Sequence, residues 1–89
     1  MERRTVLYRG MVQGVGFRYT ARAIARNHEV VGFVRNLPDG RVELVVEGEA
    51  EELKRFLDRL RTQMADYILE ATQKEEPATG EFDAFEVRF

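Results

Sequence analysis

The feature that most constrains the fold is the spacing of apolar residues, which switches twice from strand-like alternation to helical intervals. Pro38-Asp39-Gly40 lies between two strand-like segments and predicts a hairpin turn. In order, the chain is predicted to contain a strand over 5–12, a helix over 17–28, strands over 30–37 and 41–47, a helix from about 49 through 60, a strand over 67–72, a polar loop over 73–83 and a short strand over 85–89.

This order predicts an α/β (α+β) fold, a ferredoxin-like βαββαβ sandwich with a short extra C-terminal strand. Its antiparallel sheet carries both helices on one face. The first two strands are joined by a helical crossover, so they run parallel with the third strand between them. The corner after the first strand and the end of the second then share one rim of the sheet. We therefore expect Arg18 and Asn36 to lie close together.

The composition indicates one domain, residues 1–89, with a single modest core. Apolar residues make up 44% of the chain and charged residues 34%, as in globular proteins. No apolar run approaches the length of a membrane span, and the first ten residues lack the apolar stretch of a signal peptide. We expect a cytoplasmic monomer that contacts neither membrane nor nucleic acid.

Missing residue types exclude several kinds of catalytic site. The chain has no cysteine and no serine, and His28 is its only histidine. These absences exclude disulfides, thiolate sites, histidine-based metal clusters and catalytic arrangements of the Ser-His-Asp or Cys-His kind. His28 comes late in the first helical pattern, where capping or partial burial is the expected role.

Charge is distributed unevenly along the chain. Residues 1–27 hold six arginines and one acid, a net +5, whereas residues 28–89 hold eight bases and fifteen acids, a net −7, which together give −2. A basic first third in an acidic protein suits a small anion better than a nucleic acid, which favours a broad basic face. The alternative is that most of these arginines are solvated surface charge.

The corner between the first strand and the first helix reads "MVQGVGFR", residues 11–18. A helix N-terminus presents unpaired N–H groups, and glycines before it let those groups turn inward around an anion. Gly14, Gly16 and Arg18 together therefore resemble a phosphate cradle. From spacing alone, a flexible corner with an exposed arginine explains the pattern better, because Tyr19 replaces the third glycine of a dinucleotide-binding fingerprint.

"VQGVGFR" followed by "GFVRNLPDGRVELVVEG" resembles the acylphosphatase family, with the similarity strongest from Gly10 to about Leu60. The resemblance implies hydrolysis of the carboxyl-phosphate bond of small acyl phosphates without metal or cofactor. It assigns Asn36 to positioning the attacking water, and Arg18 to binding the phosphate. The resemblance also implies that backbone N–H groups of the preceding loop bind the phosphate together with Arg18, and these belong to Gln13, Gly14, Val15, Gly16 and Phe17.

The last third departs from the family pattern, with "TQMADYILEAT" where members often carry a Gly-Pro-Pro-like stretch. The tail "PATGEFDAFEVRF" keeps a Pro-x-x-Gly and an alternating apolar ending. The resemblance also suggests that the carboxylate of Phe89 pairs with Arg18. The leaving group of an acyl phosphate is a carboxylate, so its hydrolysis needs no strong general acid. The reaction therefore suits a chain that has no serine or cysteine nucleophile.

The same residues also fit roles outside catalysis. Asn36 stands beside a hairpin turn, where asparagine is common for structural reasons. The domain could also be a module that binds a phosphorylated ligand or a protein without turnover. Nucleic-acid binding is disfavoured, because the chain lacks the aromatic-rich strand that this fold uses for it. Similar domains begin larger hydrogenase maturation enzymes, and the end of the chain at Phe89 favours a free-standing enzyme.

Overall fold

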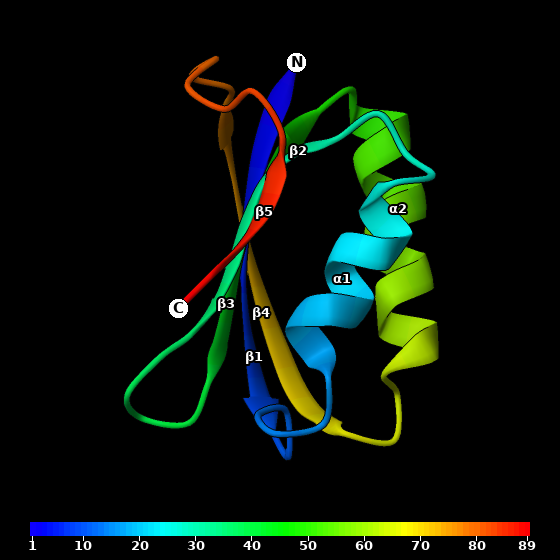
Figure 1. The fold of residues 1–89 in the computed structure, drawn as a ribbon. Helices are drawn as coiled ribbons and strands as arrows, with labels where there is room; N and C mark the ends of the chain where they lie inside the picture. Colours follow the sequence, from blue (N-terminus) through cyan, green and yellow to red (C-terminus); the bar gives the residue numbers. More distant parts are fainter.

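Five strands and two helices follow one another in the predicted order, in a computed structural model that describes residues 1–89 (Figure 1). Their bounds are β1 Glu2–Gly10, α1 Phe17–Ala25, β2 Val31–Asn36, β3 Val42–Gly48, α2 Ala50–Gln63, β4 Ile68–Pro77 and β5 Phe85–Arg88. Neither helix combines the length and the apolar character that crossing a membrane requires.

The strands form one sheet in the order β4-β1-β3-β2-β5. β1 pairs antiparallel with β3 and β4, and β2 pairs antiparallel with β3. β5 returns beside β2 and runs parallel to it, so the sheet is mixed and not wholly antiparallel as predicted. Both helices cover the same face (Figure 1). The ferredoxin-like prediction is confirmed, including the central place of β3 between β1 and β2.

The core lies between the helices and the sheet, where the alternating and helical patterns meet. Val42, Leu44 and Val46 point to this side from β3 and are fully buried. The apolar stripe of α2 is equally buried at Leu53 and Phe56. These positions are the ones that the two periodicities predict, because each element buries one face against the other.

Several predicted boundaries are wrong. β1 spans Glu2–Gly10 instead of 5–12, because its polar first residues pair through the backbone with β3 and β4, and α2 continues to Gln63 instead of ending near 60. α1 ends at Ala25 rather than 28, and residues 26–29 form tight turns in which the N–H of Asn27 and that of His28 bond the carbonyls three residues earlier. β4 continues to Pro77, whereas 73–83 was predicted to be a loop. This strand lies at the sheet edge and pairs through its backbone with β1. Its side chains are mostly exposed, so the sequence shows no apolar alternation there.

Glu47 ties the segment after β4 to the sheet face that no helix covers. The side chain, 2% exposed, accepts hydrogen bonds from Arg3 Nε at 2.8 Å, Thr79 N at 3.0 Å, Thr79 Oγ1 at 2.9 Å and Gly80 N at 3.0 Å. Burial alone would raise the pKa of Glu47, but these hydrogen bonds outweigh it and lower the pKa from 4.5 to about 2. The anchored segment leads directly into β5.

Candidate functional site

The corner between β1 and α1 depends on two glycines in the left-handed backbone region. Gly14 has φ 77° and Gly16 has φ 78°, values that most other residues adopt only with strain. A Cβ atom at either position would meet nothing within 4 Å, so the backbone conformation and not crowding requires glycine. The space in front of this corner is open.

The backbone N–H groups of residues 13–19 donate no hydrogen bond within the chain. The first N–H of α1 that is used belongs to Thr20, which bonds the carbonyl of Gly16 at 2.9 Å. No side chain caps this helix, and its first turn carries no acid. The helix therefore presents its unpaired donors and the positive end of its dipole at the open corner.

Arg18 is held by the C-terminal segment and not by an acid. Its Nη1 donates to the carbonyl of Arg88 at 3.1 Å, and its guanidinium carbon lies 4.7 Å from the centre of the Phe89 ring. The expected ion pair with the terminal carboxylate of Phe89 is absent from the ion pairs of the structure, and a backbone carbonyl and an aromatic face take its place. The positive charge of Arg18 is therefore not neutralised by a carboxylate.

The structure brings Asn36 to the same place. A cavity of about 140 Å³ contains both predicted residues, and its lining residues are Val12, Gly14, Gly16, Phe17, Arg18, Tyr19 and Asn36. Asn36 is the last residue of β2, and the topology of the sheet places it at this rim, as predicted from the sequence. The volume leaves room for a tetrahedral anion with water beside it.

The turn does not use the side chain of Asn36, which makes no hydrogen bond in the chain. Asp39 organises this turn instead, with Oδ1 accepting from Arg41 N at 3.1 Å and Oδ2 from Arg41 Nε at 2.8 Å. The hydrogen bond from the Arg41 backbone is the main cause that lowers the pKa of Asp39. A purely structural role for Asn36 therefore lacks a contact to support it, and its amide is free to bind a ligand.

Gln13 connects the glycine corner to the hairpin that carries Asn36. Its side-chain Nε2 donates to the carbonyl of Leu37 at 2.8 Å and to that of Arg41 at 3.0 Å. These two carbonyls close the neck of the β2–β3 hairpin, where Leu37 N also bonds Arg41 O at 2.8 Å. The family resemblance predicts that Gln13 binds phosphate through its backbone N–H group. The structure adds a side-chain tie between the two halves of the site.

Of the remaining residues of the corner, some pack against the core, whereas Tyr19 is exposed at the cavity. Phe17 is 2% exposed, and its ring centre lies 4.8 Å from that of Tyr8. Val15 packs against the core from outside. Tyr19 is half exposed and lines the cavity, and the guanidinium carbon of Arg22 lies 5.2 Å from the centre of its ring.

Sequence reasoning missed three contacts here: the Gln13 tie, the Arg88 carbonyl and the ring of Phe89. The first two act through backbone carbonyls, which no residue type reveals. No group of three or more His, Cys, Asp or Glu side chains is placed to hold a metal ion.

Comparisons with known proteins show the family and the fold of the chain. The family model for acylphosphatase matches residues 4–87. A curated acylphosphatase of Syntrophus aciditrophicus is 43% identical over 90 residues, covering 100% of this chain and 94% of that protein. One of Acaryochloris marina is 42% identical over 78 residues, covering 88% and 84%. The crystal structure of acylphosphatase from Bacillus subtilis superposes with a TM-score of 0.89 at 26% identity and covers 100% of both chains. The chain belongs to the acylphosphatase family of hydrolases.

Proposed function

We propose that this chain, acting as one domain over residues 1–89, hydrolyses the carboxyl-phosphate bond of small acyl phosphates to a carboxylate and inorganic phosphate. Family membership supports the reaction. The observation that carries the site assignment is the cavity that Arg18 and Asn36 line together. It lies at the corner where the N–H groups of residues 13–19 are unpaired.

The phosphoryl group binds at the corner. Arg18 uses the donors that the Arg88 carbonyl does not occupy, and its planar guanidinium matches two oxygens of a tetrahedral anion. The N–H groups of residues 13–18 contact the remaining oxygens. Because these donors are already in place, they stabilise charge on the transferring phosphoryl group without reorganising at the moment of reaction.

Asn36 positions the attacking water. Its amide accepts from and donates to one water molecule and holds it opposite the leaving group. A new O–P bond forms from this water while the bond between phosphorus and the carboxyl oxygen breaks. The electron pair leaves with the carboxylate, and the proton of the water passes to a phosphate oxygen of the substrate. A carboxylate is a weakly basic leaving group, so this step needs no protein acid.

The test is turnover of benzoyl phosphate by the pure protein, measured with and without EDTA. We expect equal rates in both conditions and loss of activity in Arg18→Ala. A phosphate titration followed by NMR should first shift the amides of residues 15–19. Absence of turnover in a protein that still binds phosphate would show a binding module instead, and shifts centred on α2 would show that the anion site is misplaced.

A further inference from the structure

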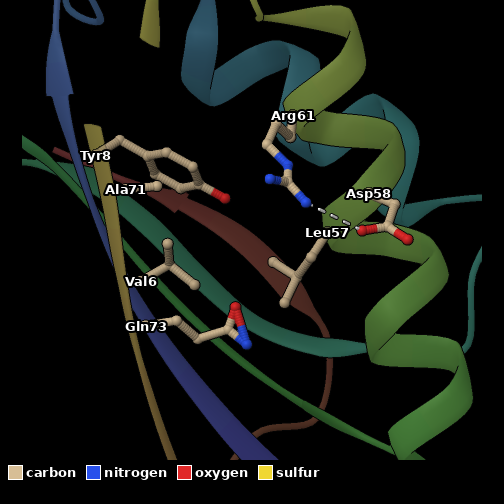
Figure 2. Close-up of a pocket in the computed structure, with 7 residues that line it drawn as sticks. All are labelled: Val6, Tyr8, Leu57, Asp58, Arg61, Ala71 and Gln73. Carbon is tan, nitrogen blue, oxygen red and sulfur yellow. Dashed lines mark ion pairs between the residues drawn. The ribbon is translucent and has the colours of Figure 1, made fainter. Parts of the chain in front are cut away.

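A second cavity of about 140 Å³ lies between α2 and the β1–β4 side of the sheet (Figure 2). It shares no residue with the cavity at Arg18. Apolar side chains and four polar ones line it, namely Val6, Tyr8, Leu57, Asp58, Arg61, Ala71 and Gln73.

The hydroxyl of Tyr8 points into this cavity without a partner (Figure 2). Tyr8 is 2% exposed, and no group of the chain hydrogen-bonds its hydroxyl. The only unpartnered side-chain polar atom that is sealed from solvent is Nε2 of His28, so the Tyr8 hydroxyl keeps its access through the cavity. Burial raises the pKa of Tyr8, and the nearby charge of Arg61 offsets this only in part. The hydroxyl therefore keeps its proton at neutral pH and can donate a hydrogen bond.

Arg61 supplies a second donor beside this hydroxyl. Its Nη2 lies 3.6 Å from Oδ1 of Asp58, an ion pair without a hydrogen bond. Asp58 also pairs with Lys54 at 3.6 Å, so two cations share one carboxylate. The guanidinium of Arg61 consequently retains free N–H groups. The amide of Gln73 makes no hydrogen bond in the chain either and faces the same space (Figure 2).

The rest of the lining is apolar, with Val6 from β1, Leu57 from α2 and Ala71 from β4. An inorganic anion would leave this surface without a contact. A volume of about 140 Å³ has room for a ligand of a few carbon atoms. The carboxylate of Asp58 also lines this end, but it is already paired with Lys54 and Arg61. The donors at this end and the apolar surface beside them fit an anionic head with a short alkyl chain.

We propose that this cavity binds a small aliphatic monocarboxylate such as propionate. The carboxylate accepts hydrogen bonds from the Tyr8 hydroxyl and from Arg61, and the alkyl chain lies on Val6, Leu57 and Ala71. This site is independent of the proposed hydrolysis, because none of its residues lines the cavity at Arg18.

The test is a propionate titration followed by NMR at constant pH in saturating phosphate, which occupies the site at Arg18. We expect saturable shifts of the amides of Leu57, Arg61, Ala71 and Gln73. The dissociation constant should fall about fourfold for each methylene added from acetate to butyrate, the value of one buried CH₂ group. Propionamide has the same shape without the charge and should bind at least about tenfold more weakly.

Variants identify the donors. Tyr8→Phe keeps the ring against Phe17, and removing an unpartnered hydroxyl should leave folding intact. Tyr8→Phe and Arg61→Gln should each weaken propionate binding by about tenfold or more. Arg59→Gln removes the same charge from the same helix outside the cavity and should bind like wild type. Shifts that do not saturate, or equal affinity in all three variants, would overturn the proposal, whatever the outcome of the acyl phosphate assay.

Discussion

Removing the charge of Glu47 should destabilise the fold in a pH-dependent manner. Glu47 accepts four hydrogen bonds from Arg3, Thr79 and Gly80, and a glutamine amide cannot accept all of them. A carboxyl pKa lowered from 4.5 to about 2 corresponds to about 3 kcal/mol of stability, at about 1.4 kcal/mol per pH unit. Because the side chain is only 2% exposed, solvent screening reduces this value little. We therefore expect Glu47→Gln to cost about 2–3 kcal/mol at pH 7.

The sign of the pH dependence follows from the direction of the pKa change. The pKa of Glu47 is lower in the folded chain, so its contribution is fully present above about pH 4.5 and is lost as the pH falls toward 2. The stability difference between wild type and Glu47→Gln should shrink across this window. Urea unfolding at a series of pH values from 7 down to 2.5 measures that difference directly, with other carboxylates cancelling between the two proteins.

Glu43→Gln is the matched control for this experiment. Glu43 lies on the same face of β3 and pairs with Arg35 at 2.6 Å, but the side chain of Arg35 is about half exposed. Such a pair contributes less than about 1 kcal/mol, and its loss should be small at every pH. A Glu47→Gln cost no larger than that of Glu43→Gln, or one that does not change between pH 7 and 2.5, would refute the reasoning.

Three further changes probe the site. Gln13→Leu removes the tie to the hairpin and should lower kcat/KM by about tenfold in steady-state assays, while unfolding by urea changes by no more than about 1–2 kcal/mol. Gly16→Ala should cost about 1–2 kcal/mol in the same unfolding assay, and Gly16→Asn should cost less, because asparagine tolerates a φ of 78°. Deleting residues 87–89 removes both contacts that hold Arg18 and should lower thermal stability and kcat together, and full activity would contradict that role.

The fold could be predicted where an element buries one face, because burial then imposes a periodic spacing of apolar residues. The alternation of β3 and the helical spacing of α2 both arise from one buried face, and each was placed correctly. The second half of β4 has no buried face. Its polar residues pair with β1 through backbone groups that every residue carries, so a strand over 73–77 reads as a loop.

Glu47 shows a second limit. The alternation along β3 correctly places Glu47 on the face away from the helices, and that face of a sheet is usually solvated. The chain then returns with Thr79 and Gly80 and buries it. That burial depends on where a distant loop lies, which local patterns do not reveal.

The site was predictable only in part for the same reason. Topology alone indicated that Arg18 and Asn36 share a rim, because a helical crossover makes β1 and β2 parallel. The tie from Gln13 and the hold on Arg18 end on carbonyls of Leu37, Arg41 and Arg88, and any residue could supply those. Only the positions of the backbone identify them.

The central claim is that Arg18 binds phosphate whereas Asn36 acts on water. Arg18→Ala should lose phosphate affinity and turnover together, and Arg18→Lys should remain badly impaired, because an ammonium cannot reproduce the planar fork. Arg22→Ala removes a positive charge one turn further along α1, outside the cavity, and should keep both properties. Circular dichroism checks that each variant is folded.

Asn36→Ala tests the claim most directly, through steady-state kinetics with inorganic phosphate as the competitive inhibitor. The inhibition constant for phosphate should stay near the wild-type value, while kcat falls by about 10²-fold or more, the scale of losing one positioned hydrogen-bonding group. A folded Asn36→Ala enzyme with normal turnover would contradict the account, and so would one that loses phosphate affinity as Arg18→Ala does.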